Sequence, residues 1–362
     1  MMNDKIVAIV GGGNGAHAAA VDLTLKGFEV RLFEEERFAG NMESVFKTRT
    51  IAYDGVLGKG TVNVAMVTSN LAEALDGAGR VIVSVPAFAH SHYARSLAPL
   101  LRDGQAALLF AGTFGSLVYW KELKKSGAGK EVLFAETYTL PYAARLAGQG
   151  SIMILSLTDP VLTGVMPAKH TERGMAAFKP LYPVIPAKSV LDSGLYTMNP
   201  VVHVPGCILN AGRIELMQGE FWFYREGITP GVGRVTEQLD EERMAIIKKL
   251  GYTPVSVTES LIAMGATGKN VYEAITTNEQ FAKIKGPDGY KNRYYTEDIP
   301  YGIVPWAFIG KAVGVPTPVM DALITLSDGL LERDCRKTGR TLEDLGLEGM
   351  DIDAIHDYLR NG

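Results

Sequence analysis

The sequence contains little cysteine and no long hydrophobic run. Only Cys207 and Cys335 are present among 362 residues, without a Cys-x-x-Cys motif, so we expect neither a disulfide framework nor a thiolate metal centre. No apolar stretch approaches the roughly 18 residues of a membrane-spanning helix. The N-terminus runs directly into an apolar, strand-like segment instead of a signal peptide. We therefore expect a cytoplasmic protein that binds no membrane and no metal.

An excess of basic charge is also absent. The chain has 36 Lys and Arg against 40 Asp and Glu, a formal net charge of −4. It shows no basic stripe, so nucleic acid is not an expected partner. With 47% hydrophobic and 21% charged residues, the chain is typical of a globular protein long enough for two domains. We expect its ligands to be small molecules.

The first half of the sequence predicts a doubly wound, mainly parallel sheet. Its apolar runs are rich in Val, Ile, Leu and Phe and lack strict alternation, which is typical of strands covered on both faces. Helix-like stretches lie between several of the runs, as βαβ units require. The runs are residues 5–13, 29–34, 80–86, 106–112 and 132–137.

The second half predicts a mostly helical domain. After about residue 190 the apolar residues recur at helical spacing. The clearest segments are 207–227, 234–251 and 318–339. Prolines interrupt the regular pattern in residues 180–194, which marks a boundary. We expect an N-terminal α/β domain with a doubly wound sheet over 1–190 and a mostly α-helical domain over 191–362.

A glycine-rich turn follows the first apolar run and opens an alanine-rich helix. Gly11, Gly13 and Ala16 fit the pattern G-x-G-x-x-G/A, with Asn14 and Gly15 between them. In this pattern the first glycine permits a tight turn, the second lets a pyrophosphate approach the backbone, and the third small residue permits close helix packing. The N–H groups that open the helix then face the phosphates. The turn predicts a dinucleotide site.

A carboxylate about twenty residues further on favours NAD within that site. Glu34 ends the next apolar run, where an acidic residue can accept hydrogen bonds from the adenosine ribose. It would repel the 2′-phosphate of NADP. Arg31 and Arg37 are close in sequence, so NADP is not excluded. Alternatively, the run Glu34–Arg37 is only a solvated charge cluster.

His203 lies in an apolar segment, "NPVVHVPG", four residues after Asn199. It is either a satisfied core histidine or the proton donor and acceptor that a dehydrogenase needs beside the transferred hydride. A second segment, 291–305, is polar and aromatic and contains Arg293 and Asp298. An adjacent carboxylate would fix the tautomer of His203, whereas Arg293 could also form an ordinary ion pair with Glu297 or Asp298.

Several motifs along nearly the whole chain resemble the opine dehydrogenase family, in particular its bacterial N-(1-carboxyethyl)norvaline dehydrogenase type. They occur in the family's order. The motifs are "GGGNGAHAAA", "NPVVHVPGCILNAG", "YREGITPGVG", "NRYYTEDIPYGIVP", "VGVPTPVMDALI" and "GRTLEDLGL".

The resemblance assigns the nucleotide-binding (Rossmann) role to residues 1–190 and the catalytic and substrate-binding roles to residues 191–362, an octopine/nopaline dehydrogenase-type helical domain. It also implies a role for each candidate residue. His203 and Asp298 would form the catalytic pair, Asn199 would line the site near the nicotinamide, and Arg293 would bind a substrate carboxylate. The implied reaction is an NADH-dependent condensation of an L-amino acid with a 2-oxo acid such as pyruvate. Its product is an N-(carboxyalkyl)amino acid, and the reaction also runs in reverse.

Two other functions stay open from the sequence. A two-domain 2-hydroxy acid or ketopantoate-type reductase would share the nucleotide fold but consume no amine. A non-catalytic NAD-binding sensor would bind the cofactor without turnover. The sequence does not identify the amino acid, the 2-oxo acid or the product stereochemistry, and it leaves homodimer formation open.

Overall fold

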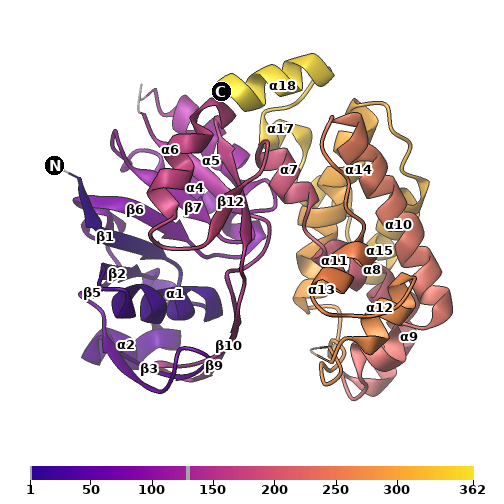
Figure 1. Cartoon of the computed structure of the whole chain (residues 1–362), viewed down its shortest axis with the longest axis horizontal. Helices are drawn as coiled ribbons and strands as arrows, with labels where there is room; N and C mark the ends of the chain where they lie inside the picture. Colours follow the sequence, from indigo (N-terminus) through magenta and orange to yellow (C-terminus); the bar gives the residue numbers. More distant parts are fainter. Residues whose placement is uncertain (1, 128–130, 280) are drawn as a thin grey trace. The chain divides into compact units, whose positions relative to one another are not determined.

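A computed structural model describes residues 2–127, 131–279 and 281–362. The chain divides into two compact units (Figure 1): Met1–Gly194 with His356–Gly362, and Leu195–Ile355. Each unit is described by itself. In the described part of the chain, no helix has both the length and the apolar character that a bilayer crossing requires.

The bounds of the first unit differ from the expected 1–190 at the C-terminal end of the chain. The last helix, α18 (Ile352–Asn361), ends against this unit. Lys169 Nζ donates to the backbone oxygen of Asn361 at 3.1 Å, and Gly362 lies directly against Trp120 and Pro167. These contacts explain why His356–Gly362 group with the α/β unit and not with the helical one.

An eight-stranded sheet forms the centre of the first unit, in the order β12-β11-β8-β7-β6-β1-β2-β5. The pairs from β5 to β8 are parallel, and β11 is antiparallel to β8. This confirms the predicted α/β class. The strands are β1 (Asn3–Val10), β2 (Glu29–Phe33), β5 (Met66–Thr68), β6 (Ala78–Val83), β7 (Ala106–Leu109), β8 (Leu133–Thr137), β11 (Val161–Met166) and β12 (Val184–Pro186).

Helices cover this sheet because the strands are apolar on both faces: every residue of β6, β7 and β8 is buried. Short helical turns lie at Glu36–Met42, Ala87–Ala89 and Ala168–His170. The helices are α1 (Asn14–Leu25), α2 (Glu43–Thr48), α3 (Leu71–Leu75), α4 (His90–Leu97), α5 (Gly115–Lys125), α6 (Thr171–Phe178) and α7 (Val190–Leu195).

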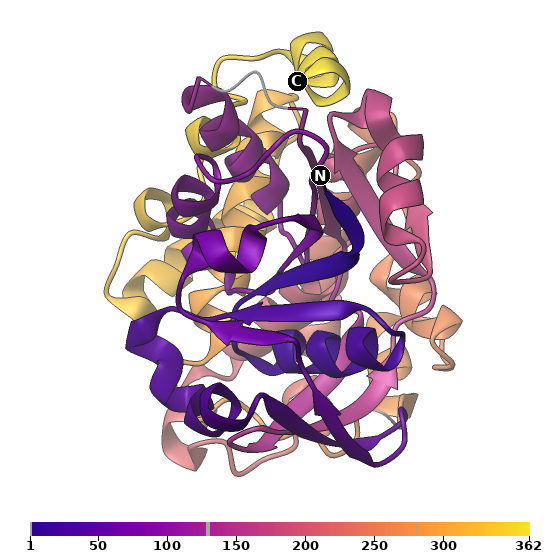
Figure 2. The ribbon, with the colours of Figure 1, turned by 90° about the vertical axis from the view of Figure 1, so that its left-hand side faces the viewer.

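A second, smaller sheet lies beside α1 (Figures 1 and 2). Its order is β4-β3-β10-β9, and the sequence did not predict it. Tyr142 at the start of β9 donates to Asp22 Oδ2 on α1 at 2.7 Å, which ties the sheet to the helix. The strands are β3 (Thr50–Gly55), β4 (Gly60–Asn63), β9 (Tyr142–Gly148) and β10 (Ser151–Leu157).

The second unit is helical, as predicted from the apolar spacing. Two of its turns are π-helical, η4 (Phe223–Gly227) and η5 (Asp298–Ile303). The α-helices before α18 are α8 (Asn199–Leu209), α9 (Ala211–Met217), α10 (Pro230–Lys249), α11 (Val257–Ala263), α12 (Val271–Thr277), α13 (Arg293–Thr296), α14 (Val304–Ala312), α15 (Pro318–Leu331), α16 (Cys335–Thr338) and α17 (Leu342–Leu345).

A buried ion pair on α10 ties three segments of this unit together. Arg243 contacts Asp240 at 2.6 Å, and both side chains are almost fully buried. The guanidinium also donates to the backbone oxygens of Leu195 and Val255 at 2.8 and 2.7 Å. Asp240 in turn accepts from the backbone N–H of Val257. Each buried charge is therefore compensated, which such groups require.

Replacing Arg243 is expected to destabilise the protein strongly. Arg243→Leu leaves the Asp240 carboxylate buried without its counter-charge, so we expect a loss of about 3–5 kcal/mol in the free energy of unfolding. Chemical denaturation measures it. Lys47→Leu, which breaks the exposed Lys47–Glu43 pair, is the matched control and is expected to cost less than about 1 kcal/mol. Equal losses in the two variants would contradict this account.

Candidate active site

The glycine turn lies between β1 and α1 in the first unit. Gly11 has φ +114°, and an added Cβ would lie 2.4 Å from the backbone oxygen of Ser84, so only glycine fits there. Gly13 precedes α1 with ordinary backbone angles, and a Cβ there would meet nothing within 4 Å. The space outside Gly13 is open beside the N–H groups that begin the helix. This cradle fits the pyrophosphate of a dinucleotide.

Asn14, Gly15 and Ala16 follow the glycine turn at the start of α1 and pack against the rest of the unit. Ala16 is fully buried, and a Cβ at Gly15 would lie 2.5 Å from Ser84 Oγ, so both positions require small residues. The Asn14 side-chain oxygen accepts from the backbone N–H of Leu146 at 2.8 Å. Asn14 thus fastens the start of α1 to β9, and a direct part in cofactor binding stays a prediction.

Glu34 lies at the end of β2, next to the glycine turn. A Cβ at Gly12 would come within 2.6 Å of its Oε2. Burial raises the pKa of Glu34, while hydrogen bonds from the backbone N–H groups of Glu35 and Gly12 act in the opposite direction. Glu34 thus lies beside the glycine turn, and its role in ribose binding stays a prediction.

In the second unit, the structure brings His203 and Asp298 together. His203 is on α8 and Asp298 begins η5, and the Nδ1 to Oδ2 distance is 2.7 Å. The close approach of the two elements depends on Gly302, because a Cβ there would lie 2.5 Å from Pro200. His203 is only 6% exposed. Two residues 95 positions apart in the sequence thus form one largely buried pair.

Two tyrosines complete the surroundings of His203. The hydroxyl of Tyr224, on η4, lies 2.8 Å from His203 Nε2. The ring of Tyr294, on α13, stacks on the imidazole with centroids 3.7 Å apart. The sequence analysis missed both, although both lie in the motifs "YREGITPGVG" and "NRYYTEDIPYGIVP". Tyrosines in an aromatic run are typical of a core, so the sequence carried no separate signal for them.

Burial dominates the electrostatics around the pair. It raises the pKa of Asp298, and the neighbouring His203 acts in the opposite direction by charge and hydrogen bonding. It also raises the pKa of Cys207, one turn along α8, with the charge of Asp298 adding to the effect. The Cys207 thiol therefore stays protonated, which argues against a nucleophilic role.

Arg293 and Asn199 are near the pair in sequence but make no direct contact with it that the structure records. Arg293 Nε donates to Glu297 Oε2, and its side chain is 65% exposed. Asn199 is the first residue of α8, one turn before His203, and is exposed. The ion-pair partner of Arg293 is thus Glu297, not Asp298, and substrate binding by Arg293 or Asn199 stays a prediction.

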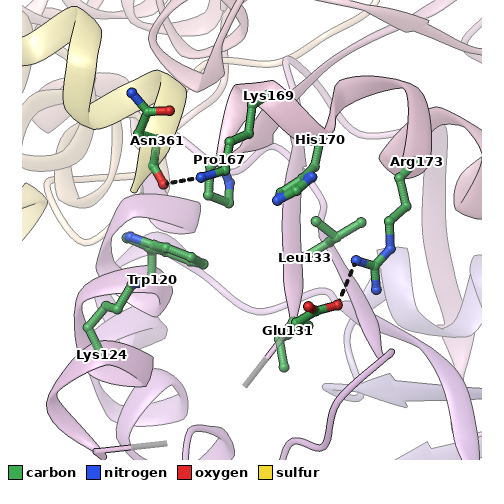
Figure 3. Close-up of a pocket in the computed structure, with 10 residues that line it drawn as sticks. Trp120, Lys124, Glu131, Leu133, Pro167, Lys169, His170, Arg173 and Asn361 are labelled. Carbon is green, nitrogen blue, oxygen red and sulfur yellow. Dashed lines mark hydrogen bonds and ion pairs between the residues drawn. The ribbon is translucent and has the colours of Figure 1, made fainter. Parts of the chain in front are cut away.

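A cavity of about 150 Å³ lies elsewhere in the first unit (Figure 3). It opens beside Leu133, at the amino end of β8, whereas the glycine turn follows the carboxyl end of the parallel strand β1. It is therefore not the nucleotide cradle. In the ranges that the structure describes, no three His, Cys, Asp or Glu residues are grouped so that they could hold a metal ion.

Comparison with known proteins agrees with this arrangement. Residues 186–331 match the family model of the NAD/NADP octopine/nopaline dehydrogenase α-helical domain. The opine dehydrogenase of Arthrobacter sp. (strain 1C) is 32% identical over 357 residues, which cover 98% of this chain and 99% of the relative. The chain belongs to the opine dehydrogenase family. Membership makes it an oxidoreductase of the dehydrogenase class and confirms the resemblance seen in the sequence.

Solved structures agree on the opine dehydrogenase fold. Octopine dehydrogenase in complex with NADH and agmatine superposes with a TM-score of 0.77 at 21% identity and covers 98% of both chains. A PanE/ApbA family ketopantoate reductase of Ralstonia eutropha JMP134 reaches 0.55 at 18% identity, covering 90% of this chain and 98% of its own. The rival reductase class therefore shares this general fold, and the family match separates the two.

The glycine turn of this family member yields a paired prediction. Gly13→Ala is expected to fold normally, because its Cβ has room, yet to raise the Kd for NADH by about tenfold or more, because the methyl fills the phosphate cradle. Gly11→Ala is expected to lose about 1–3 kcal/mol of stability from its left-handed backbone alone. Fluorescence titration with NADH and thermal melting measure the two effects. Unaltered NADH binding by Gly13→Ala would contradict the assignment.

Proposed function

We propose that the protein catalyses the NADH-dependent condensation of an L-amino acid with a 2-oxo acid such as pyruvate. The amine attacks the keto carbon, water leaves, and the imine is reduced to an N-(carboxyalkyl)amino acid. The observation that carries this proposal is the buried His203–Asp298 pair, at 2.7 Å, within the helical region that matches the family model. The two free, buried cysteines agree with a reducing cytoplasmic location.

We assign cofactor binding to the N-terminal domain, residues 1–190, and substrate binding to residues 191–362. When bound, NADH supplies the hydride that reduces the imine carbon. Gly11, Gly13, Gly15 and Ala16 would form the pyrophosphate turn, and Glu34 would accept hydrogen bonds from the adenosine ribose.

Glu34 would also repel a 2′-phosphate and so favour NADH over NADPH. The side chains of Arg31 and Arg37 support this preference because both already form ion pairs with carboxylates of the protein. Arg31 pairs with Glu29 at 2.8 Å, and Arg37 pairs with Glu35 at 2.5 Å. A 2′-phosphate would have to displace these carboxylates to gain a guanidinium.

His203 would manage the protons of the condensation. Loss of water from the carbinolamine requires a proton on the leaving oxygen, and an imidazolium can supply it at neutral pH. Asp298 would stabilise the imidazolium and keep a proton on Nδ1, since its carboxylate accepts at that nitrogen. The imidazole is recharged by the ammonium group of the amino acid, which must lose one proton before its nitrogen attacks. Loss of water then leaves a protonated iminium that accepts the hydride, so His203 is unchanged over the cycle.

The experiment that tests this function crosses a panel of amino acids with a panel of 2-oxo acids and follows NADH oxidation at 340 nm. We expect oxidation only when both substrates are present. Oxidation with the 2-oxo acid alone would indicate a 2-hydroxy acid or ketopantoate-type reductase. Tight NADH binding without oxidation by any pair would indicate a sensor.

Removing the catalytic pair is expected to abolish most turnover. His203→Ala should lower kcat by about 10²- to 10⁴-fold, the usual span for a lost acid–base group, with NADH binding nearly intact. Asp298→Asn should also impair kcat, because a neutral partner stabilises the imidazolium less. Steady-state kinetics and NADH titration measure the two effects. Near-normal kcat with a lowered Tm in His203→Ala would identify His203 as a core residue.

Arg293 is proposed to hold the carboxylate of the 2-oxo acid. A guanidinium binds a carboxylate through two parallel hydrogen bonds, and Arg293 is exposed enough to exchange Glu297 for a substrate. Arg293→Lys should therefore raise the KM of the 2-oxo acid by about tenfold, with little change in NADH affinity. Arg225→Lys, at the exposed Arg225–Glu279 pair, is the matched control. Equal KM values in the two variants would assign Arg293 to the scaffold.

A further inference from the structure

His203 has no ring nitrogen free for a substrate in this structure. Nδ1 is bonded to Asp298, Nε2 is 2.8 Å from the Tyr224 hydroxyl, and one face is stacked on Tyr294. The residue is 6% exposed. If His203 exchanges protons with a substrate, as proposed above, the path must begin at the group that occupies Nε2.

We propose that Tyr224 is a positioning residue that completes this path. Protons pass between His203 Nε2 and the substrate side through the hydroxyls of Tyr224 and Tyr294. The inference rests on the proposed function and extends it, because it assigns roles to two tyrosines outside the His–Asp pair. Tyr294 stacks on the His203 ring, and it is close enough to Tyr224 to raise the pKa of that hydroxyl by charge and hydrogen bonding, so it is the next hydroxyl along the path.

Tyr224 suits this role because a hydroxyl both donates and accepts. It donates to Nε2 when His203 is neutral and accepts from Nε2–H when His203 is charged. In a transfer, the Nε2 proton moves to the Tyr224 oxygen, the hydroxyl proton of Tyr224 moves to the Tyr294 oxygen, and the hydroxyl proton of Tyr294 passes to the substrate side. Neither tyrosine gains or loses a proton overall. Burial raises the pKa of Tyr224 well above the usual value, so a tyrosinate is disfavoured and the protons move together.

Packing keeps the Tyr224 hydroxyl against His203. The Tyr224 ring stacks on Phe281 with centroids 4.6 Å apart and meets Phe223 edge-on at 5.0 Å. Tyr224 is only 4% exposed, whereas Tyr294 is partly exposed. Tyr294 is therefore the more exposed of the two tyrosines and the outer residue of the path, and the side chain of Tyr224 has little room to swing aside.

Other titratable groups around the pair come from each neighbouring segment. Cys207 lies on α8 itself, Glu297 precedes η5, and Arg293 begins α13; the last two act on Asp298 in opposite directions. None of them is recorded in contact with Nε2. Glu297 and Arg293 therefore act on Asp298, whereas Cys207 acts on both Asp298 and Tyr224 by charge. Among the residues that the structure describes, Tyr224 is the one recorded with a hydrogen bond at Nε2, so removing the Tyr224 hydroxyl is the most direct change at Nε2.

The test uses the full-length protein with ¹⁵N-labelled histidine and needs no turnover. The chain has six histidines, and the resonance missing from His203→Asn assigns His203. In Tyr224→Phe, protonated His203 has no acceptor for its Nε2–H, and neutral His203 has no donor to its Nε2. The loss costs more free energy in the protonated form than in the neutral form. We therefore expect the NMR titration of His203 to move to lower pH by about one unit.

Tyr295→Phe is the matched control. Tyr295 is also a buried tyrosine, and its hydroxyl donates to the backbone oxygen of Cys207 at 2.9 Å, away from Nε2. It loses a comparable buried hydrogen bond, so both variants should lower Tm similarly, but Tyr295→Phe should leave the His203 titration unchanged. If the His203 titration in Tyr224→Phe matched that in the wild-type protein or in Tyr295→Phe, the inference would be overturned.

Turnover provides the second readout. Tyr224→Phe should lower kcat by about tenfold or more with KM nearly unchanged, because the proton path is cut while the substrates still bind. A kcat equal to that of Tyr295→Phe would also overturn the inference. Failure of the proposed function has a different signature: the wild-type protein oxidises no NADH with any substrate pair, although the titration of Tyr224→Phe still shifts.

Discussion

The hydrogen bond between His203 and Asp298 is the constraint around which the second unit is arranged. A carboxylate and an imidazole can be buried together only if their polar atoms are satisfied. Four elements contribute to this: α8 supplies the imidazole, η5 the carboxylate, η4 the hydroxyl on Nε2, and α13 the stacked ring. Gly302 allows η5 to approach Pro200 closely enough. Two of the four elements are π-helical turns, which occur often at functional sites.

The first unit depends on a different constraint, the open start of α1. A helix leaves its first N–H groups without backbone partners, and here nothing lies in front of Gly13. Behind the turn, in contrast, Gly11 and Gly15 are pressed against Ser84. The turn is thus closely packed on its inner side and open on its outer side, which is the arrangement that a pyrophosphate needs. Opine dehydrogenase chemistry combines these two requirements in one chain.

Much of this could be read from the sequence, for physical reasons that can be named. Strands buried on both faces appear as continuous apolar runs, so the parallel sheet was predictable. The strands β3, β4, β9 and β10 were missed because they are short or carry exposed residues, as in β9.

His203 and Asp298 were paired through family resemblance, and residue types alone left the pairing open. Tyr224 was missed because its role depends on one hydroxyl contact across 21 residues, which no periodicity encodes. Arg293 has Glu297 as its partner, one turn away on the chain, and composition could not decide between Glu297 and Asp298.

We propose that the His203–Asp298 pair serves the formation of a carbon–nitrogen bond. The most direct measurement uses NADH deuterated at the transferred position, together with an amino acid and a 2-oxo acid, and analyses the products by mass spectrometry. The account predicts one deuterium on the carbon that joins the former 2-oxo acid to the amino acid nitrogen, in a single secondary amine. A deuterated 2-hydroxy acid beside unchanged amino acid would contradict it.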